Sequence, residues 1–262
     1  MEQNKIYLGD SYELIKQIPD NSIDLIYTDP PYEFTGTVMG RGMFSARGAL
    51  DIKDNSSESS ALRTGHQRPR KQPYQDIQGN DKLTKGITND ILTEFVRVMK
   101  TINIYLWCNK IQIPQYLNFF LSHDCHFEIL TWHKTNPTPM THNTFLPDTE
   151  YCLYFRSKGT RLNDGHKLKS KFHISTTNKD DKHNFKHPTI KPLELVKRHI
   201  LHSTQDGDIV LDPFVGSGTT AIAARELGRN YIGIEIDPKW HEVATDRLNN
   251  IDANGQTSFI AR

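Results

Sequence analysis

The chain has 262 residues, of which 36% are hydrophobic and 24% are charged, as expected for a globular protein with a sizeable core. Its 32 Lys and Arg nearly balance 31 Asp and Glu, so a total charge of +1 argues against a uniformly basic coat or an acidic tail. Because no apolar run is as long as a membrane span or a signal peptide requires, we expect a cytoplasmic protein without membrane contact.

The alternation of short β-branched or aromatic runs with helical patterns favours a doubly wound α/β fold with a mostly parallel, seven-stranded sheet. The predicted strands are residues 6–8, 23–28, 103–108, 127–133, 150–156, 208–211 and 231–236. The predicted helices are residues 11–18, 88–100, 111–122, 192–203, 219–227 and 238–250. These elements predict one domain that spans residues 1–262.

The three cysteines, Cys108, Cys125 and Cys152, are widely spaced and form no CxxC pair. This spacing predicts buried thiols rather than a disulfide framework or a zinc site. The 12 histidines also lack a convincing metal-binding pattern, so we expect no metal.

Two segments do not fit the alternation of strands and helices. Residues 33–87 are rich in Gly, Ser and charged side chains, and an insertion of this length is typical of a lid or of a disordered segment. Residues 156–191 hold ten Lys or Arg and three Asp, a local charge of +7, which leaves −6 for the rest of the chain. The near-zero total therefore conceals a basic segment suited to nucleic acid.

The first candidate site directly follows the predicted strand 23–28. Asp29, Pro30, Pro31 and Tyr32 lie at its carboxyl end, where open α/β sheets bind ligands. Because Pro lacks an N–H group, the Asp29 carboxylate and the Pro30 carbonyl are suited to accept both hydrogens of one NH₂ group, with the Tyr32 ring stacked on a planar partner. The alternative is a Pro-capped turn in which Tyr32 packs at the rim.

The second candidate site is a Gly-rich turn, residues 212–220, between a predicted strand and a predicted helix. Its glycines allow a ligand close to the backbone, and the helix start offers free N–H groups. Glu235, at the end of the next strand, is placed to accept from ribose hydroxyls. A turn needed only for packing remains an alternative, as does a dinucleotide-binding pattern from Gly216 to Ala221.

Together, the motif 29–32 and the turn 212–218 resemble the S-adenosylmethionine-dependent DNA methyltransferases that methylate adenine N6 or cytosine N4. The order, with the catalytic motif first, is similar to the circularly permuted β class of this family, and it implies a Rossmann-like methyltransferase fold. Gly9-Asp10, the segment 187–192 and Glu235 also fall where the family has counterparts, so the resemblance covers nearly the whole chain.

The resemblance implies a role for each of these residues. Asp29, Pro30, Pro31 and Tyr32 would form the catalytic group around a flipped-out base. Asp in the first motif position usually accompanies adenine N6, so adenine is expected and cytosine N4 is the alternative. The residues expected to bind S-adenosylmethionine are Asp10, Asp29, Thr189, Lys191, Asp212, Phe214, Gly216, Ser217, Gly218, Thr219 and Glu235.

Three of these cofactor residues have a more specific expected role. Asp10 would accept from the cofactor's adenine amino group, and it could cap the following helix at the same time. Thr189 and Lys191 would meet the cofactor's carboxylate or hydroxyls, whereas the alternative for Lys191 is a solvated lysine at a helix start.

The basic segment falls where the family places target recognition, so residues 157–186 are expected to be a short recognition segment, and residues 33–87 a lid. A solvated basic loop is the alternative. The residues expected to contact DNA are Lys167, Lys169, Lys171, Lys182, Arg68 and Arg70. A catalytically inactive DNA-binding relative and a nicotinamide-dependent oxidoreductase remain as other readings of the chain, and the resemblance alone suggests a homodimer.

Overall fold

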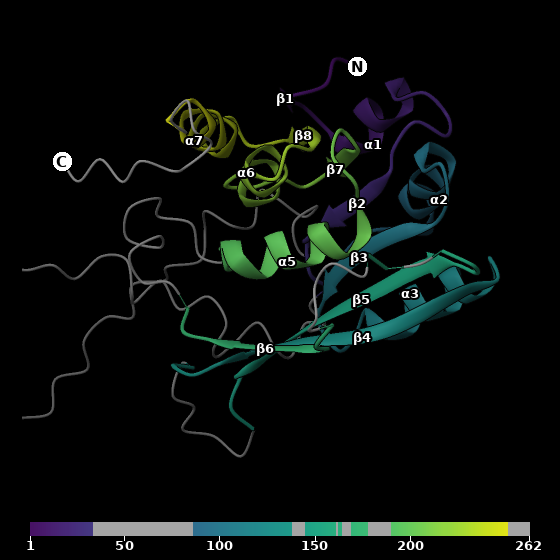
Figure 1. Ribbon diagram of the computed structural model, residues 1–262, viewed down its shortest axis with the longest axis vertical. Helices are drawn as coiled ribbons and strands as arrows, with labels where there is room; N and C mark the ends of the chain where they lie inside the picture. Colours follow the sequence, from purple (N-terminus) through teal and green to yellow (C-terminus); the bar gives the residue numbers. More distant parts are fainter. Residues whose placement is uncertain (34–85, 138–144, 161, 164–168, 178–189, 251–262) are drawn as a thin grey trace, which may run out of the picture.

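The computed structural model describes residues 1–33, 86–137, 145–160, 162–163, 169–177 and 190–250. Their strands form one sheet in the order β1-β8-β7-β2-β3-β5-β4-β6 (Figure 1). The strands are β1 (Lys5–Leu8), β2 (Leu25–Thr28), β3 (Asn103–Cys108), β4 (Cys125–Lys134), β5 (Thr149–Ser157), β6 (Phe172–Ser175), β7 (Ile209–Asp212) and β8 (Asn230–Glu235). The helices are α1 (Ser11–Leu14), α2 (Asn89–Val98), α3 (Ile113–Leu121), α5 (Leu193–Ser203), α6 (Thr219–Glu226) and α7 (Pro238–Asn249).

The doubly wound α/β fold is confirmed, but the predicted number of seven strands is wrong, because the described sheet has eight. The additional strand is β6, four residues long, which pairs with β4 at the edge of the sheet. Neither face of β6 is buried, and although its sequence Phe-His-Ile-Ser alternates apolar and polar side chains, a run of four residues is too short to predict a strand. Pairing with β4, rather than local propensity, therefore creates this strand.

Strand direction determines where the site can lie. Only β5 runs against its neighbours in the described sheet; it is antiparallel to β3 and β4, and the remaining pairs are parallel. The carboxyl ends of β1, β8, β7, β2 and β3 therefore share one edge, together with the end of β4 and the beginning of β5. Strands β2 and β7 are neighbours in the sheet although they are far apart in the chain. The circular permutation expected from the order of the motifs stays a prediction.

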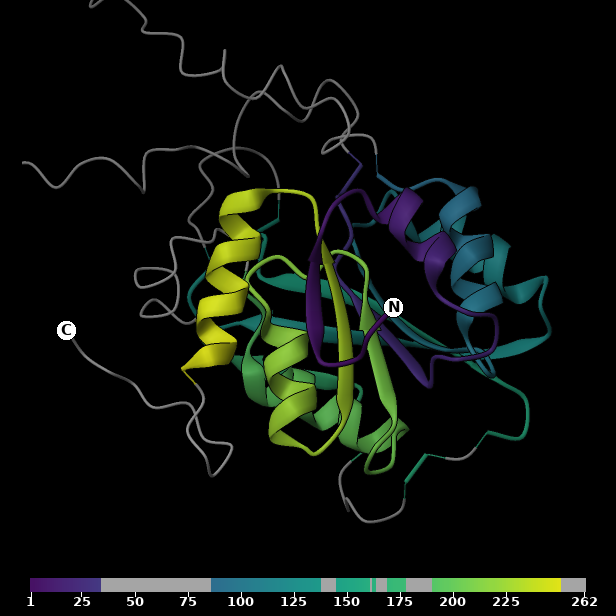
Figure 2. The same ribbon diagram turned by 90° about the horizontal axis from the view of Figure 1, so that it is seen from above.

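Helices cover both faces of the sheet (Figure 2). On one face α5, α6 and α7 pack on a core that includes Tyr27, Val196 and Ile222. On the other, α1, α2 and α3 pack on a core that includes Phe95 and Phe120. The three cysteines are buried and free, as predicted. No described helix is long and apolar enough to cross a membrane.

Candidate active site

Four carboxylates follow the ends of four adjacent parallel strands. Asp10 lies just beyond β1, Asp29 just beyond β2, Asp212 ends β7 and Glu235 ends β8. The two motifs singled out in the sequence thus meet at one edge of the sheet. Thr28, the last residue of β2, donates from Oγ1 to Asp212 Oδ1 at 2.7 Å and joins them directly.

Asp212 stabilises the Gly-rich turn through hydrogen bonds. Besides the Thr28 hydroxyl, the backbone N–H of Phe214 donates to Asp212 Oδ1 at 3.1 Å. Burial raises the pKa of Asp212 to about 7, although hydrogen bonds from Thr220, Thr28 and Phe214 act to lower it. The side chain is therefore a buried acceptor that holds the turn against β2.

Glu235 holds the same turn from β8. Its Oε2 accepts from the N–H of Gly216 at 2.8 Å, and its Oε1 accepts from the N–H of Asp237 at 2.9 Å. Burial raises the pKa of Glu235 above its ordinary value, and these two hydrogen bonds offset that effect only in part. Glu235 ends its strand as predicted, and its expected contact with ribose hydroxyls stays a prediction.

Gly218 has a structural need of its own. Its φ of +85° is left-handed, and an added Cβ would lie 3.0 Å from the Cβ of Ala244 in α7. Gly218 is therefore required for packing against α7, and its expected role at the cofactor stays a prediction. Ser217 and Thr219 are buried beside it, where Arg247 donates to the Ser217 carbonyl and, at 3.3 Å, to Thr219 Oγ1.

The loop after β1 joins the same edge. Asp10 is the N-cap of α1, since its Oδ1 accepts from the N–H of Tyr12 at 3.0 Å. The N–H of Gly9 donates to the Glu235 carbonyl at 2.8 Å, and the buried Ser11 hydroxyl donates to the Pro213 carbonyl. The N-terminal and C-terminal thirds of the chain are thereby tied together around the turn.

Asp29 is paired with a lysine that the sequence assigned to the cofactor. The ammonium of Lys191 contacts Asp29 Oδ2 and lies 3.0 Å from Glu150 Oε2, and Glu150 Oε1 lies 2.5 Å from the ammonium of Lys134. Asp29 Oδ1 is buried and makes no hydrogen bond of good geometry within the described ranges, although the neighbouring Tyr32 hydroxyl acts to lower the pKa of Asp29. The expected contact of Lys191 with the cofactor stays a prediction, and this ammonium already has two carboxylate partners.

Burial and neighbouring charges oppose each other in this group. Burial raises the pKa of Asp29 and Lys191 acts to lower it, with a net increase above the ordinary value. Burial acts to lower the pKa of Lys191, but Asp29 and Glu150 together outweigh it and raise that pKa. Burial acts to raise the pKa of Glu150, but Lys191 and Lys134 outweigh this effect and lower the pKa below its ordinary value. Lys191 and Glu150 are therefore charged at neutral pH.

The backbone after Asp29 is held from α3 and the loop before it. The fully buried Gln112 donates from Nε2 to the Pro31 carbonyl at 3.1 Å, and Asn109 donates from Nδ2 to the Glu33 carbonyl at 2.6 Å. The Tyr32 hydroxyl is buried without a hydrogen-bond partner among the described residues. The Asp-Pro-Pro-Tyr tetrapeptide is thus fixed from the side of α3.

Sequence reasoning placed Thr28 next to the first motif without giving it a role, and it missed Gln112, Glu150 and Lys134. The one local signal for Glu150 is an acidic residue directly before an aromatic and apolar run, residues 151–155, in a strand whose centre is buried. No pattern pointed to Gln112, because its role depends on α3 lying beside the tetrapeptide.

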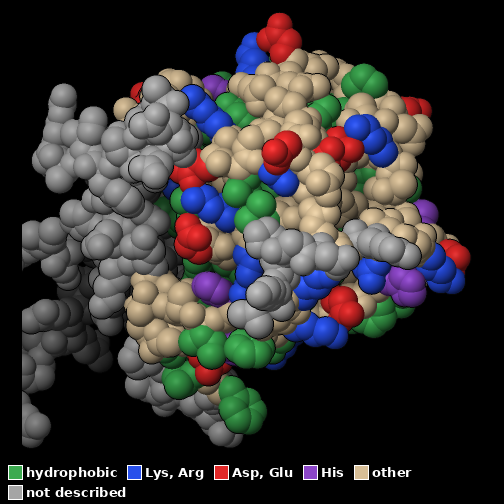
Figure 3. All heavy atoms as spheres, in the orientation of Figure 1, with side chains coloured by type: hydrophobic (Ala, Val, Ile, Leu, Met, Phe, Trp, Pro, Cys, Tyr) green, Lys and Arg blue, Asp and Glu red, His purple; other side chains and the backbone are tan. Residues whose placement is uncertain are grey.

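The expected DNA contacts are only partly within the described structure. Arg68, Arg70, Lys167 and Lys182 lie outside the described residues, as does the expected cofactor residue Thr189. Lys169 and Lys171 are exposed next to β6, and Lys171 forms an ion pair with Glu128 of β4. Figure 3 shows several Lys and Arg side chains over the region where Figure 1 places β4 and β6.

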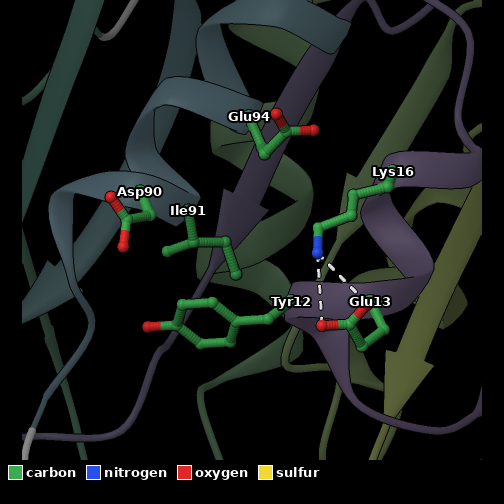
Figure 4. A pocket seen from close by; sticks show the side chains of 6 residues that line it. All are labelled: Tyr12, Glu13, Lys16, Asp90, Ile91 and Glu94. Atoms are coloured by element: carbon green, nitrogen blue, oxygen red, sulfur yellow. Dashed lines mark hydrogen bonds and ion pairs between the residues drawn. The ribbon is translucent and has the colours of Figure 1, made fainter.

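A hollow of about 310 Å³ lies elsewhere, between α1 and α2 (Figure 4). Its lining residues are Tyr12, Glu13, Lys16, Asp90, Ile91 and Glu94. Three of these six are acidic, and none was expected to take part in catalysis or cofactor binding. In the described part of the chain, no group of three metal-ligating side chains gathers at this hollow or elsewhere.

A mostly parallel sheet between two helical layers, with a Gly-rich turn and a half-buried Asp-Pro-Pro-Tyr motif at adjacent strand ends, defines a Rossmann-like methyltransferase. The family model described as DNA methylase matches residues 23–246. The chain therefore belongs to this family, and it is a DNA methyltransferase.

Individual relatives agree with this assignment. The chain is 30% identical to the Type II methyltransferase M2.DpnII of Streptococcus pneumoniae, over 94% of this chain and 90% of the relative. It is 30% identical to the Type II methyltransferase M.HinfI of Haemophilus influenzae, over 96% of this chain and 70% of the relative. The crystal structure of the M1.HpyAVI–SAM complex is similar with a TM-score of 0.65, 26% identity, and coverage of 94% of this chain and 98% of that one.

Proposed function

We propose that this chain transfers a methyl group from S-adenosylmethionine to N6 of adenine in DNA. The main observation in support of this proposal is the environment of the two carboxylate oxygens of Asp29. Its Oδ2 is held by Lys191, whereas its Oδ1 is buried without a partner among the described residues. Leaving a buried acceptor unpaired is costly, so this atom suits an N–H group of a substrate.

The chemistry follows from the properties of an exocyclic amine. The lone pair of this nitrogen is delocalised into the ring of the base, which makes it a poor nucleophile. Asp29 Oδ1 and the Pro30 carbonyl accept its two N–H groups and favour a tetrahedral nitrogen, whose lone pair is then free to attack in line. Asp29 Oδ1 also accepts the proton that the methylated nitrogen loses.

S-Adenosylmethionine supplies a methyl group bound to a positively charged sulfur. The residues present fit it, because a Gly-rich turn lies between acidic side chains at the ends of adjacent strands, Asp212 at the end of β7 and Glu235 at the end of β8, where open α/β sheets bind ligands. Gly216, Ser217, Gly218 and Thr219 would line its methionine part with Phe214, Glu235 would hold the ribose and Asp10 the adenine. Cys108 is no nucleophile, since burial raises the pKa of its thiol to about 12.

DNA is the partner of this reaction. The target base must leave the duplex stack to reach Asp29, and Tyr32 offers it a ring for stacking. We assign recognition to residues 157–186, with Lys169 and Lys171 at the DNA, and a lid function to residues 33–87. The Type II methyltransferases among its relatives favour a restriction–modification system, and a homodimer remains part of the proposal.

The test is Asp29→Ala. Because this change removes the acceptor but not the turn that binds the cofactor, methyl transfer to duplex DNA should fall about a hundredfold or more. Binding of S-adenosylmethionine, followed by calorimetry, should survive. An equal loss of cofactor binding would contradict the role of Asp29.

The base is tested separately, by hydrolysing DNA that has been methylated by the wild-type protein. The labelled product should be N6-methyladenine, and N4-methylcytosine alone would overturn the choice of adenine. Tight DNA binding without turnover would point to an inactive relative, and affinity for NAD but not for S-adenosylmethionine would point to an oxidoreductase.

A further inference from the structure

Four alternating charges run through the active-site edge. They are Asp29 after β2, Lys191 before α5, Glu150 at the start of β5 and Lys134 at the end of β4. The side chains of Lys191 and Glu150 are only 7% and 12% exposed. Such burial is tolerated only when each charge has a close partner of opposite sign, so these contacts determine one another.

The position of Lys191 is restricted from several sides. Pro192 follows it and is the N-cap of α5, which confines the preceding backbone to extended conformations. Its ammonium also lies 4.8 Å from the ring centre of Trp107 in β3 and 5.9 Å from that of Tyr32. The lysine is therefore directed at Asp29 and away from solvent.

We propose that Lys191 is a positioning residue for methyl transfer, which holds Oδ2 of Asp29 so that Oδ1 faces the target amine, while Glu150 holds Lys191 in place. This inference rests on the proposed function and deepens it. It places the action of Lys191 at the target base rather than at the cofactor. Lys134 completes the group by occupying the second oxygen of Glu150.

The charge state of Asp29 gives this role a measurable consequence. Only the ionised carboxylate offers both oxygens as acceptors, one to Lys191 and one to the base. Lys191 favours the ionised form, whereas burial and Glu150 disfavour it. The charged and titratable groups that face Asp29 are Lys191, Glu150, Tyr32, Tyr27, Cys108, Cys152, Tyr116 and Asp212.

The experiment measures the methylation rate of the full chain against pH, from about 5.5 to 9, at saturating DNA and cofactor. In Lys191→Met the acid limb of the profile should move up by about one pH unit or more, which is at least about tenfold in rate near the limb. In Glu150→Gln, whose amide oxygen still accepts from Lys191, the limb should move down. Lys191→Arg should stay near the wild-type profile.

A control distinguishes this role from a structural one. Lys197→Met removes another lysine of α5, whose ammonium lies 2.5 Å from Glu226, outside the active site. The acid limb of the pH–rate profile of Lys197→Met should coincide with that of the wild type. General loosening of the fold would lower the rate of both active-site variants without moving their limbs in opposite directions, and that result would overturn the proposal.

Two further outcomes are decisive. If Lys191→Met weakens binding of S-adenosylmethionine and leaves the limb in place, Lys191 serves the cofactor and the proposal fails. If Lys191→Met does not fold, the downward shift in Glu150→Gln decides alone, and its absence contradicts the proposal. Failure of the proposed function is seen separately, as a wild-type protein that produces no N6-methyladenine.

Discussion

Asp29 and Asp212 have nearly the same local sequence, yet their surroundings differ. Each follows a short apolar strand, each precedes a proline, and their strands β2 and β7 are neighbours in the sheet. Asp29 contacts a lysine through one oxygen and leaves the other without a partner among the described residues. Asp212 accepts from the Thr28 hydroxyl and the Phe214 N–H, and no ion pair to it is found in the described part of the chain.

The difference shows how one dipeptide can serve two purposes at the same edge of a sheet. Asp212 accepts hydrogen bonds from β2 and from its own turn, so it stabilises the shape of the Gly-rich turn. Asp29 is oriented by a charge but left incomplete, which is the state of a group that awaits a ligand. Three changes test this contrast, beginning with the largest expected effect.

Asp212→Ala should mainly lower the stability of the fold, whereas Asp29→Ala should mainly lower the rate of methyl transfer. The change leaves the buried Thr28 hydroxyl and the Phe214 N–H without their acceptor, which should lower the free energy of unfolding by about 1–3 kcal/mol. Urea unfolding measures it, and the exposed Asp246→Ala in α7 is the matched control, with a change under about 0.5 kcal/mol. Equal stability losses in Asp29→Ala and Asp212→Ala would remove the contrast.

Gln112→Ala should act on the Asp29 side alone. The change removes the donor to the Pro31 carbonyl and loosens the tetrapeptide, so kcat should fall by about three- to tenfold, which corresponds to roughly 1 kcal/mol. Affinity for S-adenosylmethionine should stay unchanged in a calorimetric titration. Gln115→Ala serves as control because its side chain donates to Ile87 and Asn89 instead. A loss of cofactor affinity in Gln112→Ala would show that the two regions are not separate.

The smallest effect is a pH dependence of stability. Burial raises the pKa of Asp212 in the folded protein to about 7, whereas its pKa in the unfolded chain is near 4. The contribution of this group to the free energy of unfolding is therefore fully present below about pH 4 and is lost as the pH rises through 7. Asp212→Asn lacks this dependence. The Tm of the variant minus the Tm of the wild type should therefore increase by a few degrees as the pH rises from about 5 to about 8. Thermal melts of both proteins provide the comparison, and a constant difference across this range would contradict the raised pKa.

Much of the fold and part of the site followed from local patterns. The apolar runs before Asp29 and Asp212 identified β2 and β7, and Asp10 is the helix cap that its position suggested. Strand β6 escaped prediction because its pairing with β4, rather than its own composition, makes it a strand. Glu150 escaped because a lone acidic residue in a strand has no identifiable partner until the strands are assembled.

The sequence by itself indicated the class of protein, because its two motifs, in their order along the chain, resemble those of the amino-methylating DNA methyltransferases. Only the tertiary structure decided what each carboxylate contacts. The partner of Lys191 depends on β2, β4 and β5 converging with the segment before α5, and such contacts depend on distance in space rather than on spacing in the chain. For that reason Lys191, expected at the cofactor, is found holding Asp29.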